Sequence, residues 1–129
     1  AEGVVLLVSS SYRSYAYQSE VFARNAAQDG LELARVRSAE PGRSQHQLGA
    51  AIDFGSIDDS FAGTKAGTWL SANARRFGFS LSYPKGLEAE TGYVWESWHY
   101  RYVGGAAAAL EAEFFDGVQA RMIAFLERY

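Results

Sequence analysis

The chain has 129 residues, 48% of them hydrophobic, and only two prolines, which suits one compact domain over residues 1–129. Its 12 Lys and Arg residues against 15 Asp and Glu residues give a formal net charge of -3, and the basic residues are scattered, so we expect no nucleic-acid partner. The absence of cysteine excludes a disulfide scaffold, a cysteine-ligated metal and a thiol nucleophile.

The N-terminal half of the chain predicts two strands and a helix. The aliphatic and β-branched run 4–8 predicts a buried strand, and apolar residues at helical spacing predict a helix from about 14 to 29. Arg13 then lies on the turn between strand and helix. After a loop, the segment 46–55, "HQLGAAIDFG", predicts a short apolar strand, and Gly49 lets the backbone bend as the chain enters it.

The C-terminal half alternates between helical and strand patterns. Apolar residues on one face predict a helix that ends at Gly78, followed by an alternating strand 79–83 and a long turn. The aromatic and β-branched stretch 93–104 predicts one or two strands interrupted near Glu96. In the tail we expect a short helix and then a longer one, with Asp116 as the N-cap of the second. The order of elements predicts an α+β fold in which helices flank a small, mostly antiparallel sheet.

Both histidines of the chain have an acidic neighbour, which raises the question of a metal site. A catalytic zinc ion needs three protein ligands and one open position, and His46, Asp53 and His99 could supply two imidazoles and a carboxylate. His46 and Asp53 are seven residues apart and would point to opposite faces of a flat strand, so the chain must bend between them. Glu96 and His99 are three residues apart, and a kink between them would bring both side chains to one pocket.

Taken one at a time, these residues favour ordinary structural roles. A single histidine near aromatic residues is more often structural than a metal ligand. Asp53 alone could accept hydrogen bonds from turn amides at a strand end, and Glu96 alone could be a solvated strand residue. Only the joint occurrence of these residues favours a metal site.

Two motifs of fixed spacing carry a family resemblance. The segments "SQHQLGAAID" (44–53) and "ESWH" (96–99) match Ser-x-His-x-x-Gly-x-Ala-x-Asp and Glu-x-x-His. Together they resemble the VanY-type D-alanyl-D-alanine carboxypeptidases, a zinc metallopeptidase family that includes L,D-carboxypeptidases and belongs to the superfamily of lysostaphin, D-Ala-D-Ala peptidases and hedgehog domains. The stretches "SSYRSYAYQ", "YPKG" with "TGY", and "WHYRYVG" extend the resemblance from about Val4 to Gly104. Ser11 and Ser97 depart from the glycine and proline of many relatives.

The resemblance implies roles for individual residues. His46, Asp53 and His99 would be the ligands of one Zn²⁺ ion, and Glu96 would be the base that takes a proton from the attacking water and delivers it to the departing amine. Arg13 would face the substrate and stabilise the oxyanion or clamp a carboxylate. The further substrate contacts that we expect are Gln18, Ser44, Tyr83 and Trp98.

Each of these further contacts has a plainer alternative. Gln18 fits a solvated helix position equally well, and Ser44 could cap or steady the loop around His46. Aromatic residues in strands, here Tyr83 and Trp98, belong more often to the core than to a substrate site.

The resemblance also implies a substrate and a location. The substrate would be a peptidoglycan stem peptide that loses its C-terminal D-alanine, so the protein would act outside the cytoplasm, in the periplasm or cell envelope. No apolar run reaches the roughly 18 residues of a membrane span. The chain starts nearly inside its first predicted strand, so we expect that a signal, anchor or other leading segment has been removed. We expect the domain to act as a monomer.

Rival functions stay open at this point. The same family pattern fits an L,D-carboxypeptidase that acts on the tetrapeptide stem, or an endopeptidase if the groove is open past the terminal residue. A non-catalytic zinc-containing binding domain of the same fold is the rival from another class. A structural zinc ion needs a fourth protein ligand and no base, so Glu96 favours the enzyme. An interaction domain without metal requires both motifs to be accidental.

Overall fold

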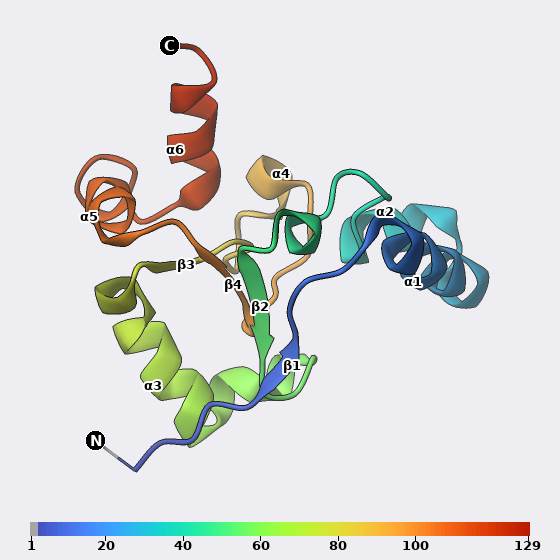
Figure 1. Cartoon of the computed structure of the whole chain (residues 1–129), viewed down its shortest axis with the longest axis horizontal. Helices are drawn as coiled ribbons and strands as arrows, with labels where there is room; N and C mark the ends of the chain where they lie inside the picture. The colour runs from blue at the N-terminus through green and yellow to red at the C-terminus, as the bar shows by residue number, and fades with distance from the viewer. Residues whose placement is uncertain (1–2) are drawn as a thin grey trace.

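A four-stranded antiparallel sheet forms the centre of the computed structural model, which describes residues 3–129 (Figure 1). Its strands lie in the order β1 (Val8–Ser10), β2 (Ala51–Phe54), β4 (His99–Tyr102) and β3 (Phe79–Leu81). The helices are α1 (Tyr15–Asp29), α2 (Leu31–Arg37), α3 (Lys65–Asn73), α4 (Glu88–Thr91), α5 (Gly105–Phe114) and α6 (Gln119–Leu126), with the 3₁₀ helices η1 (Gln45–Leu48), η2 (Asp59–Gly63) and η3 (Ala74–Phe77). The predicted α+β fold with a small antiparallel sheet is confirmed.

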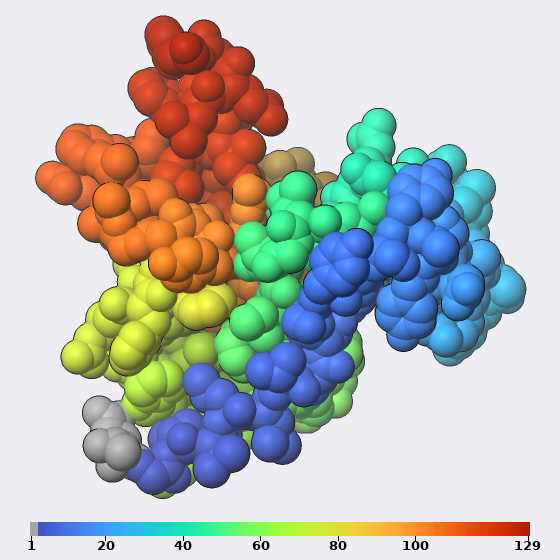
Figure 2. Space-filling model, in the orientation of Figure 1, coloured from blue at the N-terminus to red at the C-terminus, as the bar shows by residue number. Residues whose placement is uncertain are grey.

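The helices flank the sheet on two sides. Figure 1 shows the packed pair α1 and α2 on one side, and α3 and α5 on the other. In Figure 2 the N-terminal segment lies across the face toward the viewer before it continues into α1, and the C-terminal segment projects from the body. Within residues 3–129, no helix is long and apolar enough to cross a membrane.

Strands β2 and β4 separate the hydrophobic core from the polar face of the sheet. Successive side chains of a strand point to opposite faces, so Phe54 and Tyr100 enter the core while Asp53 and His99 point the other way. The register pairs Asp53 directly with His99 across the two strands. Directly paired residues hold their side chains within contact distance, and the register therefore brings two candidate metal ligands together.

The core lies between the sheet and the segment η2–α3–η3. Its buried members are Phe54, Phe61, Leu70, Ala74, Trp98 and Tyr100. Phe61 is 1% exposed, and the backbone of Gly67 in α3 comes so close that a Cβ atom there would lie 2.0 Å from the Phe61 carbonyl oxygen. Only glycine permits this approach of α3 to η2.

The first predicted strand is wrong in position and burial. Strand β1 comprises Val8–Ser10, and Val5 and Leu7 in the predicted run are 74% and 67% exposed. Only Leu6 packs against the core. An aliphatic run shows that burial is favourable, but β1 is an edge strand, and within residues 3–129 no further strand pairs with its outer side.

The first helix is confirmed, whereas the segment after it holds an element that the sequence did not predict. Helix α1 begins after Ser14, whose side chain accepts a hydrogen bond from Tyr17 N, and ends at Gly30. The chain then forms α2, a helix of 7 residues that packs on α1.

Several boundaries in the second half also differ from the prediction. The helix expected before Gly78 consists of η2, α3 and η3, and the long turn contains α4. The stretch 93–104 contributes one strand, β4, after a turn at Ser97 and Trp98. Helix α5, with 10 residues, is longer than α6, with 8, so the expected order of lengths is wrong.

Asp116 does not cap the last helix. It has a positive φ of 54°, its carboxylate lies 2.6 Å from Arg121 Nη1, and the N-cap of α6 is Val118. An ion pair with the first turn of α6 replaces the expected hydrogen bond to the backbone.

Candidate active site

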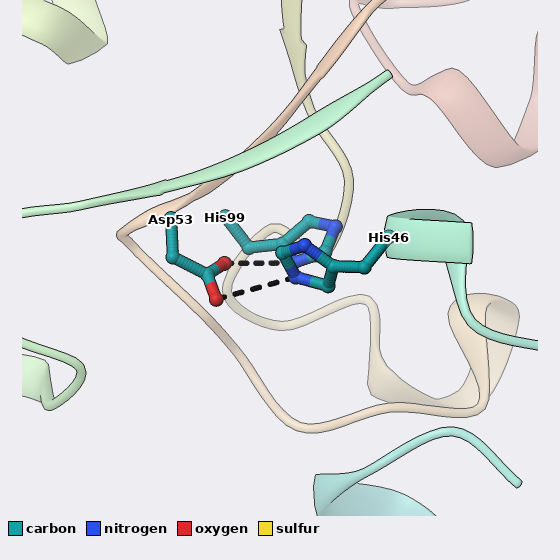
Figure 3. Close-up of side chains that lie close together, drawn as sticks. All are labelled: His46, Asp53 and His99. Atoms are coloured by element: carbon teal, nitrogen blue, oxygen red, sulfur yellow. Dashed lines mark ion pairs between the residues drawn. The ribbon is translucent and has the colours of Figure 1, made fainter. Parts of the chain in front are cut away.

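Three buried side chains from three elements converge on one point (Figure 3). His46 comes from η1, Asp53 from β2 and His99 from β4, and they are 3%, 2% and 4% exposed. His46 Nε2 lies 3.2 Å from Asp53 Oδ2, and His99 Nδ1 lies 3.0 Å from Asp53 Oδ1. The two imidazole rings meet edge to face, with their centroids 4.8 Å apart.

The bend that the sequence required between His46 and Asp53 is present. The Ser44 hydroxyl accepts a hydrogen bond from His46 N and starts η1, and Gly49 ends it with a left-handed φ of 70°. After Gly49 the chain turns directly into β2, so His46 lies over Asp53. His46 therefore lies on a 3₁₀ helix ahead of β2, and the strand predicted over 46–55 is limited to Ala51–Phe54.

The hydrogen bonds of the two histidines leave one nitrogen of each ring facing Asp53. His46 Nδ1 lies 2.6 Å from the Ser11 carbonyl oxygen, and His99 Nε2 lies 3.1 Å from Gln45 Oε1. Because carbonyl and amide oxygens only accept, both of these nitrogens carry the proton. The lone pairs of His46 Nε2 and His99 Nδ1 then point to the side where Asp53 lies.

The spacing of these atoms fits a tetrahedral metal ion. Ligands about 2.1 Å from zinc lie roughly 3.4 Å from one another, close to the 3.0 and 3.2 Å that separate Asp53 from the two imidazoles. Asp53 Oδ1 is buried, and within residues 3–129 it has no aligned hydrogen-bond donor. Two imidazoles and one carboxylate are the donor set of a catalytic zinc site.

The charge of Asp53 is maintained inside the protein. Burial by itself raises the pKa of this carboxyl, but hydrogen bonds and positive charge from His46 and His99, when the nitrogens that face Asp53 are protonated, outweigh burial and hold the pKa well below its ordinary value. Burial also lowers the pKa of His99, which favours the neutral imidazole, although the hydrogen bond and charge of Asp53 oppose this. An ionised carboxylate beside neutral imidazoles is the state that binds a cation.

Glu96 lies beside the three ligands without belonging to them. Its Oε2 atom is 3.5 Å from His99 Nδ1, its side chain is 12% exposed, and the turn at Ser97 and Trp98 separates it from β4. Burial, and then the charge of Asp53, raise the pKa of Glu96 from 4.5 to about 8, although Arg13 opposes this. A carboxyl group with a pKa near neutrality can accept and return a proton.

Arg13 is fixed by three partners at the start of α1. Its Nη2 atom lies 2.9 Å from Asp53 Oδ2, its Nε donates to Ser10 Oγ at 3.0 Å, and its Nη1 donates to Gln18 Oε1 at 3.4 Å. The side chain is 17% exposed and lines the cleft. The guanidinium is therefore held in one orientation next to the ligand cluster.

Gln18 and Ser44 line the same cavity but already have partners inside the protein. Gln18 is 1% exposed, and its amide nitrogen donates to the Ala39 carbonyl oxygen at 2.8 Å. Ser44 caps the 3₁₀ helix that carries His46. That both touch the substrate stays a prediction, and these hydrogen bonds favour a role in orienting Arg13 and His46.

The aromatic candidates lie close to the ligands and are largely buried. The Tyr83 ring centroid is 4.9 Å from that of His99 and 4.8 Å from that of Tyr93, and burial raises the pKa of the Tyr83 phenol. Trp98 lines the cavity and also belongs to the core cluster. Both rings can thus form an apolar wall of the site.

A cleft of about 900 Å³ opens over the ligand cluster. Its walls come from α1, the end of α2, the segment 57–59 and the segment 93–99, and they hold cations such as Arg24 and Lys85 as well as anions such as Asp58. This volume accommodates a small peptide, and the mixed charges of the walls suit a substrate that carries both carboxylates and amines.

The sequence did not predict the contact between Gln45 and His99. Gln45 stands inside the motif 44–53, at a position that the motif leaves free, so its residue type gave no signal. Its partner is 54 positions away in the chain and becomes its neighbour because η1 packs against β2, the strand that pairs with β4.

Comparison with known proteins found a family whose sequence model matches most of this chain. The sequence model of the VanY family, described as D-alanyl-D-alanine carboxypeptidase, matches residues 1–105. A putative carboxypeptidase, YodJ of Bacillus subtilis (strain 168), is 40% identical over 113 residues, which cover 83% of this chain and 41% of that protein. The chain thus spans less than half the length of this curated relative.

Solved structures share the fold. The LdcB LD-carboxypeptidase matches with a TM-score of 0.79 and 36% identity, over 92% of this chain and 61% of that one. A mutant of the vancomycin-resistance D,D-pentapeptidase VanY, in complex with Zn(II), matches with a TM-score of 0.77 and 34% identity, over 92% of this chain and 71% of that one.

Proposed function

Because the chain belongs to the VanY family of D-alanyl-D-alanine carboxypeptidases, we propose that it is a zinc-dependent carboxypeptidase that removes the C-terminal D-alanine from peptidoglycan stem peptides. The observation that carries this proposal is the buried cluster of His46, Asp53 and His99 with Glu96 beside it and an open cleft above. A purely structural zinc site would be closed by a fourth protein ligand and would need no base.

The three ligands would hold one Zn²⁺ ion through His46 Nε2, His99 Nδ1 and a carboxylate oxygen of Asp53. A zinc ion bound there supplies a Lewis acid for amide hydrolysis. His46 and His99 contribute neutral imidazoles, and Asp53 offsets part of the charge of the cation. The hydrogen bonds to Ser11 O and Gln45 Oε1 keep both rings in the tautomer that the cation needs.

Glu96 would be the general base and then the general acid. In its ionised form it takes a proton from the water molecule that attacks the scissile carbonyl carbon. It then gives this proton to the nitrogen of the departing D-alanine as the carbon–nitrogen bond breaks. A dication held by the three residues would favour the carboxylate form of Glu96 and bring its pKa below about 8, which suits a base at neutral pH.

Arg13 would supply a fixed positive charge to the substrate. Its planar guanidinium can stabilise the developing oxyanion or pair with the terminal carboxylate of the peptide. Gln18 would help by holding Arg13, and Ser44 by starting the turn that carries His46. Tyr83 and Trp98 would bound the cleft on its apolar side.

L,D-carboxypeptidase activity on the tetrapeptide stem is the second candidate. The likeness to the LdcB LD-carboxypeptidase, at 36% identity, is as close as the likeness to the D,D-pentapeptidase, at 34%. The two activities differ in the handedness of the residue before the scissile bond. The walls of the cleft, and not the zinc ligands, would select between them.

The proposed substrate determines the location. Peptidoglycan lies outside the cytoplasmic membrane, so we propose that the protein acts in the periplasm or cell envelope, anchored there through a segment outside this chain. All of the proposed site residues come from one chain, and the proposed activity therefore requires only a monomer.

The test is release of D-alanine from defined peptides. Zinc-loaded protein is incubated with a stem pentapeptide that ends in D-Ala-D-Ala and, separately, with the tetrapeptide that ends in a single D-Ala, and free D-alanine is followed. The Glu96→Gln variant serves as the control, because an amide cannot accept the proton but preserves the shape of the side chain. We expect release from the pentapeptide and a loss of about 10²- to 10⁴-fold in the variant.

Release from the tetrapeptide alone would assign the L,D activity instead. If neither peptide loses D-alanine although one zinc ion is bound per chain, the carboxypeptidase proposal is wrong and a zinc-containing binding domain replaces it.

A further inference from the structure

A closed ring of hydrogen bonds lies behind His99, on the side away from Asp53. Gln45 Nε2 donates to Gln119 Oε1 at 3.1 Å, Gln119 Nε2 donates to Ser82 Oγ at 3.4 Å, and the Ser82 hydroxyl donates to Gln45 Oε1 at 2.7 Å. Gln119 and Ser82 are 1% and 3% exposed. The ring couples the orientation of the Gln45 amide, one end of which faces His99, to that of the Gln119 amide.

The end of the Gln45 amide that faces His99 is its oxygen. Gln45 Oε1 accepts from Ser82 and also lies 3.1 Å from His99 Nε2, which can then only be a donor. If the amide were reversed, its NH₂ group would face His99 Nε2 and would require a lone pair there, leaving the proton on Nδ1. A proton on Nδ1 occupies the lone pair that a metal ion needs.

We propose that Gln45 is a positioning residue for the metal centre and that Gln119 of α6 sets the orientation of its amide. Gln45 holds His99 in the tautomer with the proton on Nε2 and the lone pair of Nδ1 directed at Asp53. Gln119 acts one step further away, because its carbonyl oxygen accepts from the Gln45 NH₂ group and so keeps the Gln45 oxygen toward His99. The inference rests on the zinc site of the proposed function.

Through this ring, helix α6 contributes a residue behind the candidate metal site. The family match ends at residue 105, whereas Gln119 is the first residue of α6. Val118 and Met122, at 6% and 5% exposure, anchor the start of α6 in the interior, although the end of the helix projects outward in Figure 1. Because α6 packs into the interior, the buried Gln119 amide contacts Gln45 behind His99, a proposed metal ligand.

The test measures zinc affinity and uses no substrate. Zinc dissociation constants are determined by competition with a chelating dye for the unmodified chain and for Gln45→Met, Gln119→Met and the double variant. Methionine keeps the length of the side chain and removes the amide. Gln47→Met is the matched control: Gln47 lies on the same 3₁₀ helix, and its amide oxygen accepts from Gly42 N and not from the ring.

Loss of a hydrogen-bond partner behind a ligating histidine typically costs 10- to 100-fold in metal affinity. We expect a fall of about 10-fold or more for Gln45→Met, a smaller fall for Gln119→Met, and none for Gln47→Met. The double variant should bind zinc as Gln45→Met does, because Gln119 acts only through Gln45. Gln45→Glu should restore the affinity, since a carboxylate is an obligate acceptor for His99 Nε2.

Two results would overturn the inference. One is zinc binding by Gln45→Met that equals the binding of the Gln47→Met control. The other is an additive effect in the double variant, which would mean that Gln119 matters only for general stability. The melting temperature of each zinc-free variant is recorded, and Gln119→Leu, which also removes the acceptor for Gln45, replaces Gln119→Met if the latter does not fold.

The outcome separates the inference from the proposed function. The expected affinities without any peptidase activity would leave the inference standing and contradict the carboxypeptidase proposal. Failure of the unmodified chain to bind zinc would contradict both.

Discussion

Arg13 and Asp53, 40 positions apart in the chain, form an ion pair in which Arg13 Nη2 lies 2.9 Å from Asp53 Oδ2. The same oxygen lies 3.2 Å from His46 Nε2. The carboxylate that faces the metal position is thus also the anchor of the guanidinium that faces the cleft. The pair connects the turn before α1 to β2. It therefore sets the distance between the guanidinium that would bind the substrate and the proposed metal ion.

Arg13→Lys should lower kcat/KM by about 100-fold while the protein still binds one zinc ion per chain. A lysine ammonium keeps the charge but cannot contact Ser10, Gln18 and Asp53 at once, as the guanidinium does. The measurement combines D-alanine release with zinc stoichiometry. Arg76→Lys, at an exposed cation that does not line the cleft, is the control and should change kcat/KM little. A loss below about threefold in Arg13→Lys would show that a point charge is sufficient.

Removal of zinc should lower the melting temperature. A ligand at about 1,000 times its dissociation constant stabilises the folded state by about 4 kcal/mol, which for a domain of this size corresponds to a shift of roughly 10 °C or more. Thermal unfolding is compared for chelator-treated protein with and without added zinc. Magnesium should not replace zinc, because imidazole ligands disfavour a hard cation. If added zinc does not change the melting temperature of Asp53→Asn, the role of the carboxylate is confirmed. If zinc raises the melting temperature of this variant as much as that of the unmodified protein, that role is contradicted.

The stability of the zinc-free protein should fall between pH 5 and pH 9 because of Glu96. Burial raises the pKa of Glu96 from 4.5 to about 8, so the folded protein retains a proton that the unfolded chain loses near pH 4.5. The stabilisation is complete below pH 4.5 and disappears as the pH rises through about 8, and its size is on the order of a few kcal/mol. Urea unfolding at several pH values measures it.

Glu96→Gln is the matched variant for this pH dependence. Its neutral amide does not titrate, so it should be more stable than the unmodified protein near pH 9. The lowered pKa of His99 acts in the opposite direction, toward lower stability in acid, so the two proteins are compared above pH 7. Equal slopes for both proteins would mean that Glu96 titrates at its ordinary pKa.

Gly67→Ala should destabilise the fold by about 2 kcal/mol, although alanine is the better helix former by about 1 kcal/mol. The new Cβ would lie 2.0 Å from the Phe61 carbonyl oxygen, a backbone atom that cannot move without disturbing η2. Gly105→Ala at the start of α5 is the control, because a Cβ there meets nothing within 4 Å. Equal effects of the two substitutions on the free energy of unfolding would contradict this view of the core.

The sequence by itself predicted the candidate ligand set and determined the family and the class of fold. His46, Asp53, Glu96 and His99 stand in two motifs of fixed spacing, and motif residues can be identified without knowing their neighbours in space. Helix α1 was also predictable, because Ser14 and Gly30 mark its ends locally. These features depend on residues close together in the chain, whose pattern the sequence displays directly.

The tertiary structure alone decided which distant side chains meet. It put the aliphatic run before Val8 on an exposed edge, paired Arg13 with Asp53, and brought Gln119 to Gln45 behind His99. Each of these contacts joins elements that are far apart in the chain, and their register is fixed by how helices and strands fill the core. A polar residue such as Gln119 looks the same in the sequence whether it faces water or a buried amide, and only the packing around it distinguishes the two.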